Sequence, residues 1–212
     1  MKKIFLSLLI AISALFAQGN NDVFKVQTVT GKNLEFIGTP NGVITKPYEG
    51  KVVFVEFWGT WCAPCLMSIP HHQELQEKYK DKLRIIAFET TPSVTKEELK
   101  KYVNNPKKYI DMSKIDWFLK NKASSPEAKA YFQKPIKELE EFKNSGKKIT
   151  YDVVASSDGK EFVNYIAARA GWRGSIPFLI VFDPKGNVVD IIAGMPDKKR
   201  LEADIAKALK SK

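Results

Sequence analysis

The sequence has very little cysteine and histidine, with two residues of each among 212. A small secreted scaffold stapled by disulfides would need more cysteines. A structural zinc site takes four ligands, and the chain has no second cysteine pair to supply them. We therefore expect no metal site, and we expect His71 and His72 to be surface residues of a helix.

Long apolar runs are also lacking, except at the amino terminus. Lys2 and Lys3 precede a short apolar stretch that ends at Ala17, which is the layout of a secretory signal peptide. The stretch is shorter than the about 20 residues of a transmembrane helix. We predict a signal peptide over residues 1–17, cleaved after Ala17, and a periplasmic or otherwise extracytoplasmic protein. Retention as an uncleaved membrane anchor is the alternative.

Arginine is scarce, so the formal net charge of +10 comes mostly from lysine. The lysines concentrate in residues 96–148, where they alternate with aspartate and glutamate. Such alternation is typical of a solvated helical surface. Nucleic-acid sites favour arginine with interleaved aromatics, so we expect no nucleic-acid binding. An acidic partner or an anionic membrane surface is the alternative use of this segment.

The two cysteines lie three positions apart in the motif WCAPC, residues 61–65. The preceding run, residues 52–58, is β-branched and aromatic, which predicts a fully buried strand. The apolar spacing after Cys65 predicts a helix, so Cys62 would lie at a helix N-terminus. Unpaired backbone N–H groups there favour the thiolate, which is the attacking species in disulfide exchange. A structural disulfide closing so short a loop would stabilise the fold little, so redox chemistry explains the pair better.

The rest of the pattern predicts one domain, residues 18–212, of strands alternating with helices. Strands are predicted over residues 23–29, 33–37, 51–58, 83–88, 148–154, 178–182 and 188–192, and helices over about 65–79, 96–103, 159–170 and 198–209. The first two strands are predicted to form a β-hairpin, and residues 39–50 are predicted to form a loop. The strands on either side of the cysteine helix are predicted to be parallel and to form a βαβ unit with it.

Residues from about 105 to 147 are lysine-rich and helix-prone, and they predict a helical insertion. Pro126 suits the first turn of a helix, whereas Pro135 would break or kink one. Because this segment lies between the other predicted elements, we expect its deletion to leave the reaction with a small peptide largely intact.

Three groups of residues together resemble the thioredoxin superfamily, and most closely its exported TlpA/ResA-like thiol–disulfide oxidoreductases. They are the block 55–65 with Pro70, the segment 173–178 and the turn 183–188. The resemblance covers about residues 22–104 and 148–210. It implies an α/β, thioredoxin-like fold: a central mixed β-sheet flanked by helices, here with an N-terminal β-hairpin and the helical insertion.

The resemblance also implies roles for particular residues. Cys62 would be the attacking cysteine and Cys65 the resolving one. Glu56 lies six residues before Cys62, where thioredoxin has a buried aspartate that exchanges protons with the resolving cysteine. Burial would favour the protonated carboxyl and suit proton transfer, and a carboxylate that reaches the surface is the alternative. Ser68 is a departure, because some ResA-like proteins have a functional glutamate there.

The same resemblance implies a surface for the partner protein beside the cysteines. Pro177 matches the family's cis-proline, and the backbone before it would pair with an extended substrate segment. The residues predicted to contact the substrate are Trp61, Ala63, Pro64, Ile176 and Pro177.

The predicted function is that of an exported thiol–disulfide oxidoreductase that acts as a monomer on protein thiols and disulfides, without a metal or organic cofactor. It resembles the reducing branch, with cytochrome c maturation or envelope redox homeostasis as its setting and a thiol-reducing membrane protein as its electron donor. A DsbA-type oxidase, or a binding or chaperone module using the insertion, is the alternative. A peroxiredoxin-like peroxidase would need a threonine where Gly59 stands.

Overall fold

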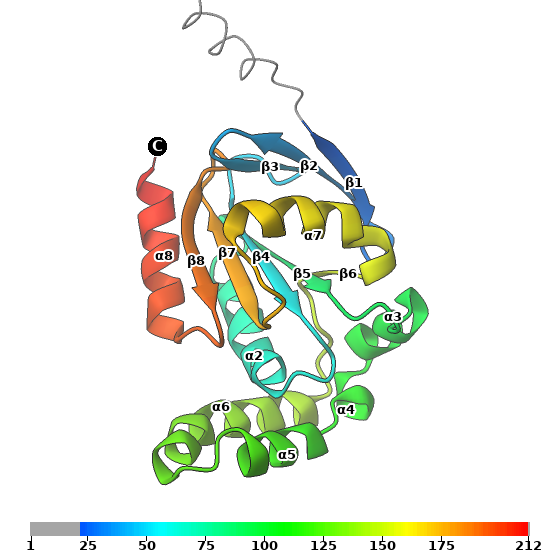
Figure 1. Ribbon diagram of the computed structural model, residues 1–212, viewed down its shortest axis with the longest axis vertical. Helices are drawn as coiled ribbons and strands as arrows, with labels where there is room; N and C mark the ends of the chain where they lie inside the picture. The colour runs from blue at the N-terminus through cyan, green and yellow to red at the C-terminus, as the bar shows by residue number, and fades with distance from the viewer. Residues whose placement is uncertain (1–21, 212) are drawn as a thin grey trace, which may run out of the picture.

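A five-stranded mixed sheet forms the centre of the computed structural model, which describes residues 22–211 (Figure 1). The predicted signal peptide, residues 1–17, lies outside the described residues. The strands are β4 (Val52–Trp58), β5 (Leu83–Glu89), β6 (Asp152–Val154), β7 (Phe178–Phe182) and β8 (Val188–Ala193), in the order β6-β5-β4-β7-β8. β4 pairs with β5 in parallel and with β7 antiparallel, so the predicted mixed sheet is confirmed.

The N-terminal segment forms a second, antiparallel sheet of three strands: β1 (Val23–Gln27), β2 (Asn33–Thr39) and β3 (Gly42–Lys46). The predicted hairpin is confirmed as β1 and β2, but the predicted loop over residues 39–50 is wrong because it contains β3. Pro40 and Asn41 form a two-residue turn, with Gly42 directly after it. Thr39 pairs with Gly42 across this turn, so the second hairpin closes through Pro40 and Asn41, and the two prolines at residues 40 and 47 made the segment resemble a loop.

β4 is buried along its whole length, and its alternate side chains enter two different cores. Phe54 and Trp58 pack in the core that contains α2 (Ala63–Lys78) and α8 (Lys198–Lys210). Val55 and Phe57 pack in the core beneath α7 (Ser156–Ala170) and the small sheet. Figure 1 shows α7 crossing in front of the sheet. Because side chains alternate along a strand, Glu56 falls on the α2 side with Phe54 and Trp58.

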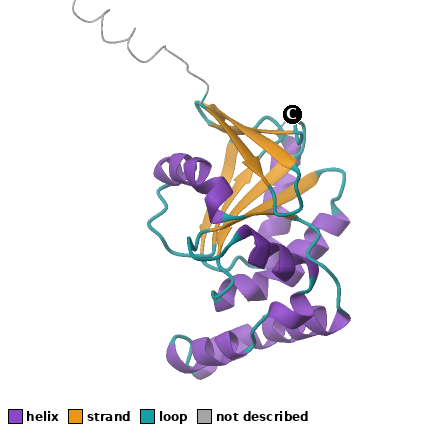
Figure 2. Ribbon diagram, turned by 90° about the vertical axis from the view of Figure 1, so that its right-hand side faces the viewer, coloured by secondary structure: helices purple, strands orange, loops and turns teal. Residues whose placement is uncertain are grey.

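The insertion is helical, as predicted. It follows α3 (Lys96–Asn104) and consists of α4 (Pro106–Tyr109), α5 (Ser113–Asn121) and α6 (Pro126–Ser145), and α5 and α6 form a lobe below the sheet (Figures 1 and 2). α6 begins at Pro126, as predicted, and it continues through Pro135, so of the break or kink predicted there the break is wrong. The side of α6 that carries Pro135, Leu139 and Phe142 is buried, and this packing offsets the hydrogen bond that a proline removes.

The insertion is also part of the main core rather than an appendage. Leu139 is fully buried in the same hydrophobic cluster as the cysteine helix, as is Ile115 of α5. Nε2 of His71 on α2 lies 2.6 Å from Oε2 of Glu138 on α6. Deleting the insertion would uncover α2, and the survival of the reaction with a small peptide after this loss stays a prediction.

The small sheet is attached to the turn between β7 and β8 by close backbone contact. Val43 N donates to Gly186 O at 2.7 Å. A Cβ atom on Gly186 would lie 2.4 Å from Val43 O, and the φ angle of Gly186 is +84°.

We expect Gly186→Ala to lower the free energy of unfolding by about 2 kcal/mol or more, measured by urea denaturation. Gly31→Ala is the control, because Gly31 has a φ of +89° with open space around it. An equal loss of unfolding free energy in the two variants would show that the close contact between Gly186 and Val43 adds nothing to the cost of the substitution.

The carboxyl groups of Asp204 on α8 and Asp190 on β8 lie close together. Burial, followed by the nearby Asp190 charge, raises the pKa of Asp204 to about 6. The folded state thus holds a proton more tightly than the unfolded state, so the free energy of unfolding should rise as pH falls from about 6 to about 4. We expect Asp204→Asn to remove this slope and to stabilise the protein by about 1–2 kcal/mol at neutral pH. Urea denaturation across this pH range measures both effects. An unchanged slope would contradict the assignment, and Asp116→Asn, at an exposed carboxylate of α5, is the control.

Candidate functional site

The cysteine pair lies where β4 ends and α2 begins. Cys62 is the N-cap residue of α2, as predicted, and its Sγ accepts a hydrogen bond from Cys65 N at 3.3 Å. Pro64 occupies the first turn, where its missing N–H costs no helical hydrogen bond. The two sulfur atoms form a disulfide. Both cysteines are buried, Cys62 at 4% exposure and Cys65 at 1%, so Cys62 is the more accessible of the two.

The segment before β7 approaches the disulfide from the other side. The Ile176–Pro177 peptide bond is cis. The carbonyl oxygen of Ile176 lies 3.7 Å from Cys62 Sγ. Residues more than one hundred positions apart therefore meet at one sulfur atom.

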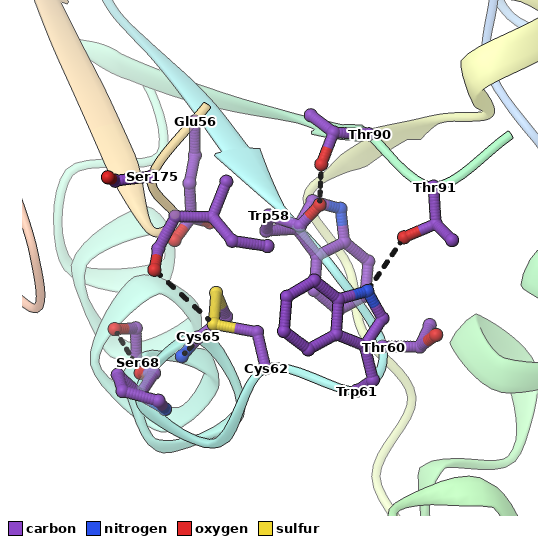
Figure 3. The surroundings of a disulfide bond; sticks show 12 residues. Glu56, Trp58, Thr60, Trp61, Cys62, Cys65, Ser68, Thr90, Thr91 and Ser175 are labelled. Carbon is purple, nitrogen blue, oxygen red and sulfur yellow. Dashed lines mark hydrogen bonds between the residues drawn. A yellow bond between two sulfur atoms is a disulfide. The ribbon is translucent and has the colours of Figure 1, made fainter. Parts of the chain in front are cut away.

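Trp61 is the most exposed of the residues predicted to contact the substrate, at 55% exposure. Its indole Nε1 donates to Thr91 Oγ1 at 2.8 Å, which holds the ring beside the disulfide (Figure 3). Pro64 and Ile176 are half-buried, whereas Ala63 and Pro177 are buried. The surface around the disulfide is thus formed mainly by Trp61, Pro64 and Ile176.

Glu56 is buried, with 3% of its surface exposed, so the alternative of a surface carboxylate is wrong. Figure 3 shows its side chain among those surrounding the disulfide. Its Oε2 lies 3.2 Å from Nδ1 of His72, which is 1% exposed. Neither ring nitrogen of His72 has a hydrogen bond within the described residues. The two side chains are therefore in close contact without aligned hydrogen-bond geometry.

The prediction that His71 and His72 lie on the surface is wrong. α2 is covered by the sheet on one side and by α6 on another, so it has little free surface. His71 faces Glu138 of α6, and His72 faces Glu56 and the edge of the Tyr151 ring, 6.0 Å away between ring centroids. Burial, followed by the Glu56 charge, raises the pKa of Tyr151 well above its ordinary value, so this phenol stays neutral.

Glu89 is a site residue that the sequence reasoning missed. It is 1% exposed at the end of β5, opposite Trp58 in the register. Its carboxylate accepts hydrogen bonds from Thr60 N at 2.9 Å and from Thr91 N at 2.8 Å. Burial raises its pKa, although these hydrogen bonds oppose the rise. Glu89 thus ties together the two segments that hold Trp61. The sequence signal that could have found it is the position of this acidic residue at the end of the predicted strand that pairs with the strand before Cys62.

Ser68 donates through its hydroxyl to the carbonyl oxygen of Pro64 at 3.1 Å, one turn earlier in α2. Within residues 22–211, no group of three or more histidine, cysteine, aspartate or glutamate side chains is arranged to hold a metal ion. Over the same residues, no helix combines the length and apolar character needed to cross a membrane.

Comparison with known proteins supports the predicted resemblance. The family model described as thioredoxin matches residues 41–102. The thiol-disulfide oxidoreductase ResA of Bacillus thuringiensis is 39% identical over 82 residues, which cover 37% of this chain and 42% of that protein. ResA of Geobacillus kaustophilus is 54% identical over 33 residues, covering 16% of this chain and 19% of that protein. The chain therefore matches less than half the length of these relatives.

Solved structures support the fold. The exposed lipoprotein thioredoxin Etrx1 of Streptococcus pneumoniae superimposes with a TM-score of 0.52 at 17% identity, over 88% of this chain and 99% of that one. A thioredoxin of Neisseria meningitidis gives a TM-score of 0.52 at 18% identity, over 90% of each chain. With the domain match and the ResA relatives, these findings confirm the predicted resemblance to the thioredoxin superfamily.

Proposed function

The chain has a thioredoxin fold, and from this premise we propose that it is a thiol–disulfide oxidoreductase that exchanges disulfides with protein partners. The observation that carries the proposal is the Cys62–Cys65 disulfide at the start of α2, which has Cys62 at the N-cap and Ile176 O 3.7 Å from its sulfur. The similarity to relatives described as thiol-disulfide oxidoreductase ResA adds support.

In the proposed reaction, the Cys62 thiolate attacks one sulfur of a partner disulfide. The partner S–S bond breaks, a mixed disulfide forms on Cys62, and the first partner sulfur leaves as a thiolate. The Cys65 thiolate then attacks the Cys62 sulfur and releases the second partner thiolate. Two electrons pass from the chain to the partner, and the Cys62–Cys65 disulfide is the product. The cysteines themselves carry the electrons, so the exchange requires no cofactor.

The backbone geometry favours Cys62 as the attacking sulfur. The N–H of Cys65 points at Cys62 Sγ from the first turn of α2, and a helix N-terminus favours negative charge. Cys65 lies deeper, at 1% exposure, and is less accessible to a partner protein. It is suited to the second, intramolecular step.

The proposed task of Glu56 is to accept the proton that Cys65 loses before the second step. Cys65 and His72 are seven positions apart on α2, which is about two helical turns, so both lie on the same face of the helix. Glu56 enters from β4 on this face and contacts His72. A general base must reach the proton that it accepts directly or through one water, and Figure 3 places Glu56 among the side chains around the disulfide.

We propose that electrons flow from this chain to its partners, so that it acts as a reductase. We also propose that it acts as a monomer. Ala63-Pro64 between the cysteines and Ile176 before the cis-proline resemble the reducing branch of the superfamily. The apolar stretch over residues 4–17 supports export, and we propose an extracytoplasmic place with a membrane protein as electron donor. Cytochrome c maturation and envelope redox homeostasis are the settings proposed for it.

The reduction potential of the Cys62–Cys65 pair tests this direction. Known members of this superfamily range from about −270 mV for thioredoxin to about −120 mV for the oxidant DsbA. Equilibration with glutathione buffers, followed by thiol labelling and mass spectrometry, measures the value directly. We expect a potential more negative than about −200 mV. A value near that of DsbA would support the alternative of a dithiol oxidase.

A further inference from the structure

A pocket of about 400 Å³ lies beside the exposed active-site tryptophan, where the thioredoxin fold meets the insertion. Its lining comes from three separate segments. Trp61 belongs to the cysteine motif. Val94 lies in the loop before α3, and Tyr102 lies in α3. Tyr109 and Asp111 belong to the insertion. A volume of this size is within the range of ligand-binding pockets.

The wall formed by Trp61 is held in place. The indole donates to Thr91, whose N–H donates in turn to the buried Glu89 carboxylate. Gly59 lies close to the inner side of the ring, and a Cβ atom there would come within 2.9 Å of the indole nitrogen. A wall fixed in this way keeps its shape when no partner is bound.

The floor of the pocket is apolar. Leu99 and Tyr102 are buried, and the Tyr102 ring packs edge-to-face on Trp58, 5.8 Å away between ring centroids. Burial, followed by the nearby Glu89 and Asp111 charges, raises the pKa of Tyr102, so this phenol is neutral. An apolar floor of this kind favours an apolar group over an ion.

The rim of the pocket is charged, with both signs present. Glu98 and Asp111 supply negative charge, and Lys101 and Lys114 supply positive charge. A rim of mixed charge over an apolar floor suits a polypeptide, which brings an apolar side chain together with polar backbone groups. It does not select a ligand of one charge.

We propose that this pocket binds a bulky apolar side chain, aromatic or aliphatic, of the partner polypeptide, close in sequence to the cysteine that joins Cys62. This inference rests on the proposed function. A partner linked to Cys62 lies beside Trp61, the neighbouring residue and a wall of the pocket, so the bound side chain lies within a few residues of the partner cysteine. The insertion thereby contributes to the choice of partner through Tyr109 and Asp111.

The test compares two synthetic disulfide-linked peptides that differ only in having phenylalanine or alanine three residues from the reactive cysteine. We expect wild-type protein to reduce the phenylalanine peptide with a kcat/KM about tenfold higher, because burial of the ring is available only to that peptide. Val94→Glu, which places a charge in the wall, and Tyr109→Ala, which removes a wall, should bring the ratio close to one. Trp117→Ala is the matched control: Trp117 is an aromatic residue of the insertion, 58% exposed and outside the pocket lining, so its loss should leave the ratio unchanged.

Equal reduction of the two peptides by wild-type protein would overturn the inference while leaving the proposed function intact. Failure to reduce either peptide or glutathione disulfide would overturn the proposed function, and the inference with it. Tyr109 is at the surface, so Tyr109→Ala remains informative if Val94→Glu does not fold. A full wild-type ratio in folded Tyr109→Ala would contradict the insertion's part in the pocket.

Discussion

Replacing Cys62 by serine is expected to abolish disulfide reduction, whereas replacing Cys65 by serine is expected to accumulate mixed disulfides with the partner. Cys62 is the more accessible sulfur, and it lies beside the Ile176 carbonyl oxygen, where a partner would dock. Without Cys65, no second thiolate is available to release the partner from Cys62. Insulin reduction followed by turbidity measures the first effect, and non-reducing gels with mass spectrometry measure the second.

The matched control is the double variant with serine at both positions, which should neither reduce insulin nor trap a partner. Each variant should unfold cooperatively in urea, so that a lost activity is not a lost fold. Trapping by Cys62→Ser rather than by Cys65→Ser would reverse the assignment of the attacking and resolving cysteines. A protein that keeps its biological activity without either cysteine would instead support a binding or chaperone role.

Glu56→Gln is expected to slow turnover at neutral pH by roughly tenfold or somewhat more while sparing the initial attack by Cys62. A well-placed general base contributes about 10²- to 10⁴-fold, but water reaches a site that a partner has opened, which reduces the loss. At high pH Cys65 ionises without help, so the wild-type and variant rates should converge. Stopped-flow measurement of mixed-disulfide formation and of its resolution, across pH, separates the two steps.

Asp204→Asn is a useful control for this experiment, because it neutralises a buried carboxyl on α8 rather than in the cysteine site. Its rate profile should follow that of the wild type. Parallel profiles of wild type and Glu56→Gln over the whole pH range, or equal rates at neutral pH, would show that Glu56 has only a structural role.

Much of the fold was predictable because its signals are local. The apolar run at residues 52–58 and the helical spacing after Cys65 are properties of short segments, and each became the expected element. The helix predicted over residues 96–103 is α3, and its start is equally local: Glu98 N donates to Thr95 Oγ1, and Thr95 N donates to the Glu98 carboxylate. Cys62 at the helix N-terminus also follows from local spacing.

The environment of the site was less predictable, because it depends on which segments pack together. His72 looks solvent-exposed in a polar stretch of sequence, yet it is buried against Glu56 because α2 is covered by both the sheet and α6. Glu89 belongs to the site only because its carboxylate accepts hydrogen bonds from Thr60 N and Thr91 N, which follow the ends of two neighbouring strands.

The sequence by itself determined the order of the strands and helices other than β3, and the position of the cysteine pair at a helix start, since strand patterns and helix caps act within a few residues. The burial of Glu56 was decided by the packing of β4 against α2. Only the tertiary structure decided that the insertion joins the main core and that Tyr109 lies in one pocket with Trp61. Residues 61 and 109 are brought together by the packing of α3 and α4 beside the sheet. No local pattern encodes such a contact, because its free energy comes from apolar surface buried between distant segments.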